Sequence, residues 1–124
     1  MNASVQWEQK AASLLRITFG GGWDWDVFYK TFTDQLEQCS ADERHLCVLI
    51  DLRDVTDIPS DAVLHLKNGA RMAEFVEGKI IIIATSIAAL TMYRLFVSIY
   101  KAVASKFSLA ANDAAAYEIL GLAP

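Results

Sequence analysis

Apolar and polar residues alternate in two short stretches near the start of the chain. Residues 5–8 read VQWE and residues 15–19 read LRITF, which is the two-residue period of strands that bury one face. We expect these two strands to pair antiparallel. The glycines at 20–22 end the second strand, and a helix is expected to begin near Asp24, which can serve as its N-cap.

Two continuous apolar runs predict central strands that are covered on both faces. Residues 45–52 read HLCVLIDL, and residues 79–85 read KIIIIAT. A helix with one apolar stripe follows the first run and is expected to end at Gly78. A long helix follows the second run and is expected to extend from Ile87 to about Lys106.

The last part of the chain predicts one more strand and one more helix. Residues 107–109 read FSL, Asn112 or Asp113 can cap the helix, and Gly121 can end it. The full order of elements predicts an α/β fold with a mainly parallel or mixed β-sheet of about five strands and about four helices, because parallel strands need crossover connections. The length of 124 residues predicts a single domain over residues 1–124.

Composition narrows the class of protein. The net charge of −4, the pI near 5.0 and the scattered Lys and Arg argue against a nucleic-acid-binding protein. The first ten residues lack the basic patch and apolar core of a secretory signal, so we expect a cytoplasmic protein. Cys39 and Cys47 are too few for a disulfide framework and have no metal-ligand spacing with His45 or His65. We expect both thiols to be reduced and buried, and we expect neither a metal nor a cofactor.

Residues 80–97, IIIIATSIAALTMYRLFV, have the apolar character of a membrane span. Arg94 lies inside this segment, however, and spans of about 20 residues rarely tolerate a central charge. The run of Ile is β-branched, whereas the residues after it are better helix formers. We therefore expect a buried strand that leads into a helix and no membrane span.

Residues 49–62 read LIDLRDVTDIPSDA. This stretch resembles a segment of the STAS domains, the sulfate transporter and anti-sigma factor antagonist family. In that family a buried strand ends in Asp-Leu, a Val follows three residues after the Leu, and Asp-Ser-Ser/Thr-Gly starts the next helix. The order of elements from about Leu15 to Leu120 is also similar to that of the family. The late part, residues 80–85 followed by a long apolar helix, resembles the sporulation-type STAS-like branch more closely than the transporter branch. The resemblance implies a STAS-like fold and a non-enzymatic regulatory role through protein contacts, as in bacterial anti-sigma factor antagonists.

The chain departs from the family at the position of its phosphorylation switch. The family's Asp-Ser-Ser/Thr-Gly corresponds to Pro59, Ser60, Asp61 and Ala62, so Asp61 stands where family kinases phosphorylate a hydroxyl. An Asp does not accept that phosphate as a stable ester, and its single charge is smaller than the roughly −1.5 to −2 of a phosphoserine. The resemblance therefore implies a partner-binding loop of Asp57, Pro59, Ser60 and Asp61 in which the switch is absent or altered.

Ser60 has two interpretations. It is a candidate phosphoacceptor displaced by one position from the family's site. As the N-cap of the next helix, it would instead accept a hydrogen bond from a backbone N–H, an interaction worth about 1 kcal/mol. We favour the cap, because Ser is among the most preferred N-cap residues.

The predicted long helix carries two apolar stripes, of which one is expected to face the core. The core stripe comprises Ala88, Met92, Leu95, Ile99 and Val103. The second stripe comprises Tyr93, Phe96, Val97 and Tyr100. Either the helix is buried more deeply than usual, or this second stripe needs a cover, such as a second copy of the chain in a homodimer, another protein partner, a bound apolar molecule or a membrane surface.

Two alternatives to a protein-interaction domain remain open. In the first, the chain is a small-molecule or lipid carrier whose apolar ligand lies between Trp23, Trp25 and the second stripe, although these two Trp residues can also simply cover the core. In the second, the chain is a receiver-like phosphoacceptor using Asp51, which begins a series with Asp54 and Asp57 at every third residue. No Cys-His or Ser-His spacing indicates a nucleophile with its base, so we expect no enzymatic activity.

Overall fold

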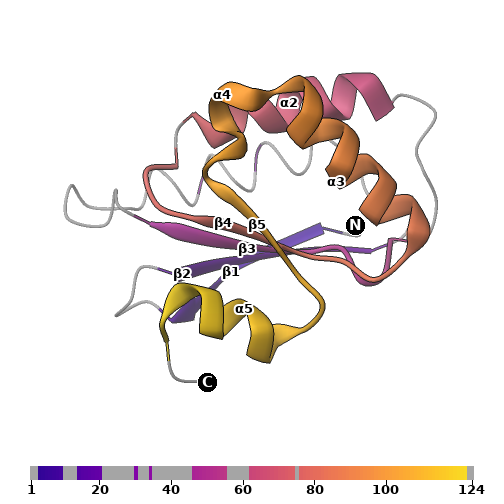
Figure 1. The fold of residues 1–124 in the computed structure, drawn as a ribbon. Helices are drawn as coiled ribbons and strands as arrows, with labels where there is room; N and C mark the ends of the chain where they lie inside the picture. Colours follow the sequence, from indigo (N-terminus) through magenta and orange to yellow (C-terminus); the bar gives the residue numbers. More distant parts are fainter. Residues whose placement is uncertain are drawn as a thin grey trace.

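The computed structural model describes residues 3–9, 14–20, 30, 34, 46–55, 62–74 and 76–122 of the chain. Strands and helices alternate along these described residues (Figure 1). In chain order the elements are β1 (Ala3–Gln9), β2 (Leu14–Phe19), β3 (Cys47–Asp51), α2 (Ala62–Ala73), β4 (Ile80–Ile83), α3 (Ile87–Ile99), α4 (Lys101–Ala104), β5 (Phe107–Ala110) and α5 (Asp113–Leu120). The predicted α/β fold class is confirmed.

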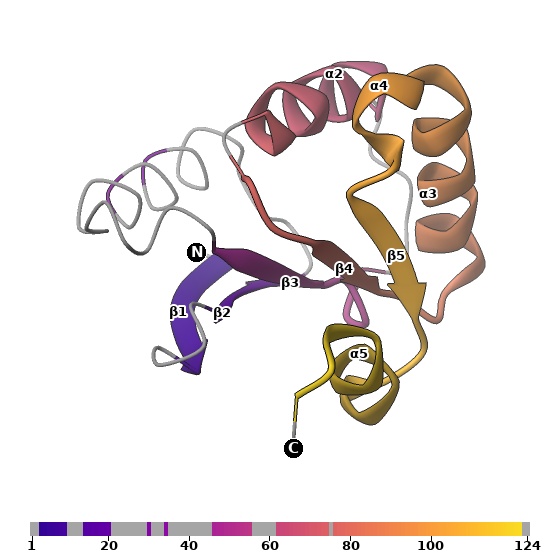
Figure 2. The same ribbon diagram turned by 60° about the vertical axis from the view of Figure 1, so that its left-hand side comes forward.

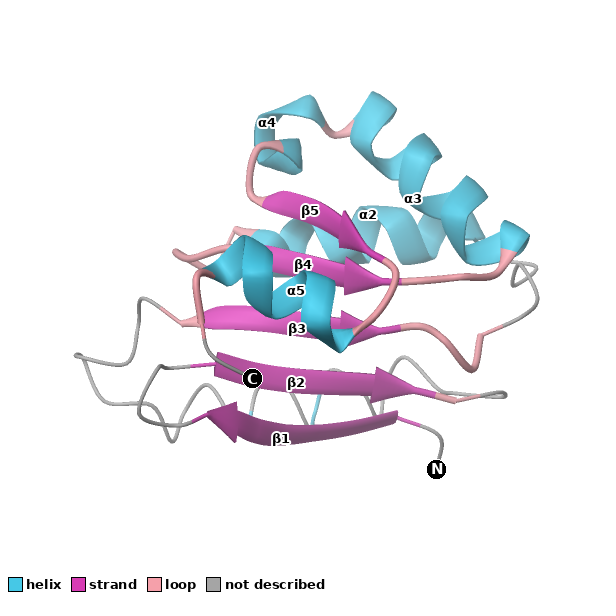
Figure 3. Ribbon diagram, turned by 60° about the horizontal axis from the view of Figure 1, so that its bottom comes forward, coloured by secondary structure: helices cyan, strands magenta, loops and turns pink. Residues whose placement is uncertain are grey.

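The described strands form one sheet in the order β1-β2-β3-β4-β5 (Figure 3). β1 pairs antiparallel with β2, as expected, whereas the other neighbouring strands pair parallel. The register sets Thr18 of β2 opposite Asp51 of β3, which in turn lies opposite Ile83 of β4. Ile83 lies opposite Ala110 of β5. The ends of the four parallel strands therefore lie along one side of the sheet, which we call the carboxyl edge.

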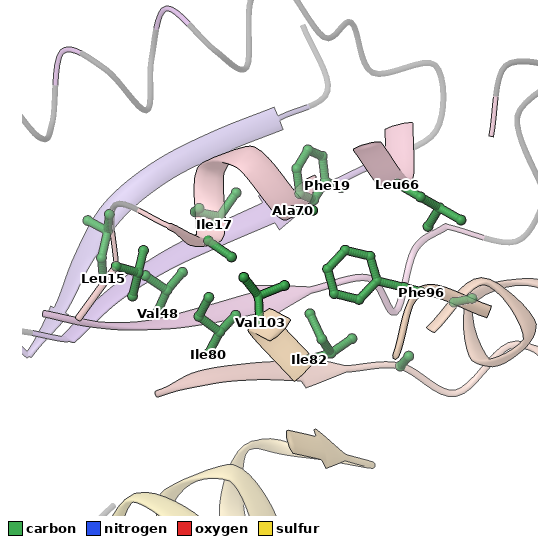
Figure 4. Packing of buried hydrophobic residues seen from close by; sticks show 14 of the residues in the cluster. Leu15, Ile17, Phe19, Val48, Leu66, Ala70, Ile80, Ile82, Phe96 and Val103 are labelled. Carbon is green, nitrogen blue, oxygen red and sulfur yellow. The ribbon is translucent and has the colours of Figure 1, made fainter. Parts of the chain in front are cut away.

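Helices cover both faces of this sheet. α2, α3 and α4 lie on one face and α5 lies on the other (Figure 1, Figure 2). Successive side chains of a strand point to opposite faces, so the strands contribute to two cores. The larger core lies under α2 and α3 and includes Leu15, Ile17, Val48, Ile80, Ile82 and Phe96 (Figure 4). The smaller core lies under α5 and includes Leu14, Leu49, Ile81, Ile83 and Ala116.

β2 is more deeply buried than its alternating sequence predicted. Leu14, Leu15, Arg16 and Ile17 are all buried, so both faces of this part of the strand are covered. The expectation of a half-buried strand was wrong because α5, from the far end of the chain, packs against the face that holds Leu14 and Arg16. This burial brings a charged side chain into the interior.

The apolar segment at 80–97 forms a strand that leads into a helix, as expected. The four Ile residues of β4 are all buried, and α3 begins after the N-cap residue Ser86. Ser86 Oγ accepts a hydrogen bond from Ala89 N at 3.1 Å and donates one to Val55 O at 2.8 Å. It therefore ties the start of α3 to the segment after β3. Among the described residues, no helix is long and apolar enough to cross a membrane.

The expected long helix is interrupted at Tyr100. This residue has φ −103° and ψ 61°, outside the helical region, and separates α3 from the short helix α4. The N–H of Tyr100 still donates to Phe96 O at 2.9 Å, so α3 ends with its last turn satisfied. The expectation of one continuous helix as far as Lys106 was wrong.

The two apolar stripes are not divided between core and surface as we expected, although two members of the predicted core stripe, Val103 and Met92, do belong to the larger core or pack against it. Phe96, expected on the uncovered stripe, is only 6% exposed. The centroid of its ring lies 4.8 Å from that of Phe107 and 5.4 Å from that of Tyr100. Leu95 and Ile99, expected in the core, are 45% and 55% exposed. Phe96 therefore cannot belong to an exposed dimer face.

Phe96 packs beside α2 in this arrangement. A Cβ built on Gly69 of α2 would lie 3.8 Å from Phe96 Cε1, which is an ordinary van der Waals contact, so the ring lies close to α2 at this position. An aromatic ring removes more apolar area from water than a Leu side chain does. α3 therefore turns Phe96 toward the core, while Tyr93 and Val97 are half-buried beside it.

The helix ends are satisfied by side chains and by glycine. Asn112 caps α5 by accepting a hydrogen bond from Ala115 N at 2.8 Å, and Gly121 ends the helix with φ 71°, as predicted. α2 ends at Ala73, which is earlier than predicted. Lys106 Nζ donates to Ala73 O at 3.0 Å and to Val76 O at 2.8 Å, so a cation lies at the negative end of the α2 dipole.

Gly78 lies where the chain crosses close to the start of β3. Its N–H donates to Leu46 O at 3.1 Å, and a Cβ on this glycine would come within 2.6 Å of that oxygen and 2.7 Å of Cys47 Sγ. Cys47 itself is a free thiol that is half-buried rather than buried as expected, because it lies at the start of the strand. Cys39 lies outside the described residues.

Replacing Gly78 or Gly69 with alanine is expected to change the stability of the fold in opposite directions. Gly78→Ala forces the backbone near Leu46 to shift, which we expect to lower the free energy of unfolding by about 1–3 kcal/mol. Gly69→Ala adds a methyl group in ordinary contact within α2, which we expect to raise it by about 0.5–1 kcal/mol. Urea unfolding of both variants measures the difference, and effects of the same sign would contradict the close approach at Gly78.

Candidate functional site

The carboxyl edge brings together segments that are far apart in the sequence. The turn after β3, the N-cap Ser86 after β4, and Asn112 with Asp113 after β5 all follow the ends of parallel strands. In open α/β sheets, ligands bind outside the carboxyl ends of the strands. The charged side chains that meet at this edge are therefore the candidate functional site.

Arg16 is the centre of this site. Its side chain is buried, and its guanidinium contacts three carboxylates from three different elements. Nε donates to Glu8 of β1. Nη1 donates to Asp51 Oδ2 at 3.1 Å, and Nη2 donates to Asp113 Oδ1 of α5 at 3.0 Å. A single buried cation therefore joins β1, β3 and α5.

Asp51 organises the turn that follows β3. Its Oδ1 accepts hydrogen bonds from the backbone N–H and from Nε of Arg53, both at 3.0 Å. Its Oδ2 accepts from Nη2 of Arg53 at 2.7 Å, in addition to the bond from Arg16. Val55 N donates to Leu52 O at 3.0 Å across the same turn. The Asp51 carboxylate thus accepts four N–H donors and holds the turn in one conformation.

Two further contacts extend the network. Nη2 of Arg53 also donates to Asp113 Oδ1 at 3.2 Å, so both arginines share one carboxylate of α5. Tyr117 of α5 donates its hydroxyl to Glu8 Oε1 at 2.6 Å. We call this network the arginine cluster, and it comprises Glu8, Arg16, Asp51, Arg53, Asp113 and Tyr117. Its inner part is buried, whereas Arg53 and Asp113 are partly open to water.

Contacts within the cluster shift the pKa values of Glu8, Arg16, Asp51 and Arg53 toward the charged forms. The hydrogen bond from Arg16 holds the pKa of Glu8 below its usual range, against the effect of burial. Burial by itself raises the pKa of Asp51, but the hydrogen bonds from Arg53 outweigh it and lower the pKa. Burial likewise lowers the pKa of Arg16, but its bonds to Glu8 and Asp113 raise it overall. Glu8, Asp51 and Arg16 are therefore charged at neutral pH.

This geometry bears on the phosphoacceptor hypothesis for Asp51. A phosphorylated aspartate must present a carboxylate oxygen to the phosphoryl group, yet both oxygens of Asp51 already accept hydrogen bonds from guanidinium groups. Freeing one of them would leave a largely buried charge without its partner. Among the described residues, no group of three or more His, Cys, Asp or Glu is arranged to hold a metal ion. The contacts of Asp51 favour a structural role.

The other predicted site residues are placed as follows. Asp57, Pro59, Ser60 and Asp61, the predicted partner-binding loop and candidate phosphoacceptor, lie outside the described residues. Trp23 and Trp25 also lie outside them. Of the predicted apolar face, Phe96 belongs to the larger core, and Tyr93, Val97 and Tyr100 are half-buried against it. Burial raises the pKa of the Tyr93 hydroxyl.

Sequence reasoning missed most of the arginine cluster. Arg16 was interpreted as the polar position of a half-buried strand, and Glu8, Arg53, Asp113 and Tyr117 were not singled out for contact with it. One signal was available, since Asp51 ends a continuous apolar run and a carboxylate in such a position needs a cationic partner. Which of the 11 Lys and Arg residues supplies the partner could not be read from the sequence.

Comparison of the sequence with protein-family models and with curated proteins gave no match. The resemblance to STAS domains therefore rests on residues 49–62 and on the order of the elements, and it stays a prediction.

Removal of the central cation is expected to destabilise the fold. Arg16→Met leaves Glu8, Asp51 and Asp113 with fewer cationic partners, which we expect to lower the free energy of unfolding by about 3 kcal/mol. Arg71→Met, the same change at an exposed position in the last turn of α2, is the control and is expected to cost less than about 1 kcal/mol. Urea unfolding at pH 7 measures both, and equal costs would show that Arg16 contributes no more than a surface arginine.

The cluster also predicts how stability depends on pH. The pKa values of Glu8 and Asp51 lie below their ordinary values of 4.5 and 3.8 in the folded protein, so the stability that they contribute is fully present above those values. It is lost as the pH falls through the lowered pKa values. We expect a steeper loss of stability below about pH 4.5 in the wild type than in Arg16→Met. Unfolding curves measured from pH 7 to pH 3 test this, and parallel curves for the two proteins would contradict it.

Proposed function

We propose that the chain is a non-enzymatic regulatory domain that binds a protein partner at the carboxyl edge of its sheet. The observation that carries the proposal is the clamping of Asp51 by four N–H donors from Arg16 and Arg53. A turn held in this way loses little conformational freedom when a partner binds it. The arginine cluster thus preorganises a surface for contact.

The clamped turn presents side chains to the solvent. Arg53 and Asp54 are both exposed at the turn, next to the buried Val55. Val55 O accepts the hydroxyl of Ser86, which connects the turn to the beginning of α3. A partner at the carboxyl edge would therefore meet the turn and α3 as one rigid surface.

The resemblance of residues 49–62 to STAS domains supports the same role. In anti-sigma factor antagonists of that family, the segment after the corresponding strand takes part in regulatory contacts and carries the phosphorylation switch. In this chain Asp61 occupies the switch position, so the proposed binding does not depend on phosphorylation. The carrier and receiver functions stay predictions, and no contact of the described residues favours either of them over this role.

Charge reversal in the clamped turn tests the proposal. Asp54→Lys changes an exposed side chain of the turn, whereas the control Glu74→Lys makes the same change in charge just after the last turn of α2, at the opposite edge of the sheet. Each immobilised protein is incubated with a soluble extract of the source cells, and the retained proteins are quantified by mass spectrometry. We expect retention of the partner to fall at least about tenfold in Asp54→Lys alone.

Two outcomes would contradict the proposal. One is a retained set that Asp54→Lys leaves unchanged, and the other is an equal loss in Glu74→Lys. Circular dichroism of both variants is measured first, so that a loss of folding is not mistaken for a loss of binding.

A further inference from the structure

We propose that a second copy of the chain covers the exposed face of α3 in a two-fold symmetric, antiparallel helix pair. This face carries Ile87, Thr91, Leu95 and Ile99 at intervals of four residues, and we call these residues the α3 stripe. Residues at this spacing form a continuous ridge on a helix. The proposal concerns the outer side of α3 and does not depend on the function proposed for the carboxyl edge.

The α3 stripe exposes three large aliphatic side chains to water. Ile87 is 85% exposed, Ile99 55% and Leu95 45%. Together they leave on the order of 300–400 Å² of apolar surface in water, which is within the range of the largest patches on ordinary monomers. A standard interface buries about 800 Å² per partner around an apolar centre. The stripe is large enough to be that centre, and the polar side chains beside it can form the rim.

The hydroxyl groups of Thr91, within the stripe, and of Ser98, beside it, already donate hydrogen bonds. Thr91 Oγ1 donates to Ile87 O at 2.7 Å, and Ser98 Oγ donates to Leu95 O at 2.9 Å. Burying these two hydroxyls against an apolar surface therefore leaves no unpaired donor. Another apolar ridge can therefore cover this face without the free-energy cost of burying an unpaired hydroxyl group.

The register of the stripe suits a copy of itself. In an antiparallel pair centred on residue 93, Ile87 lies opposite Ile99 of the second copy, and Thr91 lies opposite its Leu95. The large residues thus meet at the two ends, and a small residue meets a large one in the middle. Ridges of four-residue spacing pack into one another at an angle of about −50°. Two-fold dimers are also the commonest oligomers of soluble proteins.

Few charged side chains lie on α3, whose single charged residue is Arg94. Residues 79–112 hold four of the eleven Lys and Arg and none of the fifteen Asp and Glu, so seven cations and fifteen acids remain for the rest of the chain. Lys79 and Lys106 donate to backbone carbonyls, and the exposed cations of α3 and α4 are Arg94 and Lys101. In a pair of copies that meet through α3, these two cations are the like charges that come closer together.

The position of α3 leaves room for a second copy. α3 lies beyond β5, the last strand of the sheet, in two different views (Figure 2, Figure 3). Leu109 of β5 adds a further apolar side chain that is 37% exposed. A helix that protrudes in this way suits a flat or ridged partner better than a ligand that needs a groove.

Sedimentation equilibrium of the full chain over about 1–200 µM tests the proposal. We expect a reversible dimer whose dissociation constant rises at least about tenfold in Leu95→Glu, since a carboxylate would be buried in the apolar centre. Leu64→Glu on α2 is the control, because Leu64 is 51% exposed, close to the 45% of Leu95. We expect it to change the constant less than about twofold. A wild type that stays monomeric, or a dimer that Leu95→Glu leaves intact, would overturn the proposal.

The effect of salt on binding shows whether a second copy or an anionic partner covers the α3 stripe. Arg94 and Lys101 of the two copies would lie along the same rim, so raising NaCl from about 0.05 M to about 0.5 M should tighten the dimer by screening their repulsion. Binding of the monomer to vesicles of phosphatidylcholine and phosphatidylglycerol, weakened by the same salt, would instead show that a lipid surface covers the stripe and would overturn the proposal.

Disulfide trapping tests the register without relying on a disruptive variant. An equal mixture of Thr91→Cys and Leu95→Cys is expected to form a mixed disulfide dimer in air, whereas Leu64→Cys mixed with either one is not. The unsubstituted chain, which retains Cys39 and Cys47, gives the background. Cross-linking no greater than this background would show that the copies do not meet in the proposed register.

Discussion

The buried guanidinium of Arg16 is the interaction on which the rest of this structure depends. A cation inside a β-sheet is costly unless carboxylates compensate it, and here three carboxylates do so from β1, β3 and α5. Satisfying Arg16 therefore fixes the position of α5 on the sheet and the direction in which β3 ends. The apolar side chains under α5 supply burial on the same face, but they do not specify one arrangement as strongly as directed hydrogen bonds do.

The same cluster also holds the turn that follows β3 at the carboxyl edge of the sheet. Asp51 uses both of its oxygens to hold Arg16 and Arg53, so its charge serves to shape the turn. The exposed side chains of that turn are then presented from a rigid base, which is the property that a contact surface needs. An acid in the same place with a free oxygen would have suited chemistry on the carboxylate itself. The contacts of Asp51 thus favour a structural role for its carboxylate.

The two faces of the sheet have different roles in this account. The face under α5 is held by ionic contacts, whereas the face under α2 and α3 is held by a larger apolar core that centres on Phe96. Turning Phe96 inward leaves Ile87, Leu95 and Ile99 in water on the other side of α3. The apolar surface on which a second copy is proposed to bind is therefore a consequence of how the core is packed. It lies on a different side of α3 from the contacts that the sequence predicted.

The sequence by itself determined the described strands and helices, apart from the break at Tyr100 and the early end of α2, whereas the helix predicted to begin near Asp24 lies largely outside the described residues. The two-residue alternation, the continuous apolar runs, and the caps at Asn112 and Gly121 are local signals, because each reflects backbone geometry over a few residues. The order of these elements in turn predicted the parallel sheet.

Only the tertiary structure decided the partners of Arg16, which lie 8, 35 and 97 residues away in the chain, and which stripe of α3 faces the core. Both depend on which side chains meet in space: the carboxylates brought by β1, β3 and α5 in the first case, and the packing of Phe96 beside α2 and against Phe107 in the second. No local pattern contains that information.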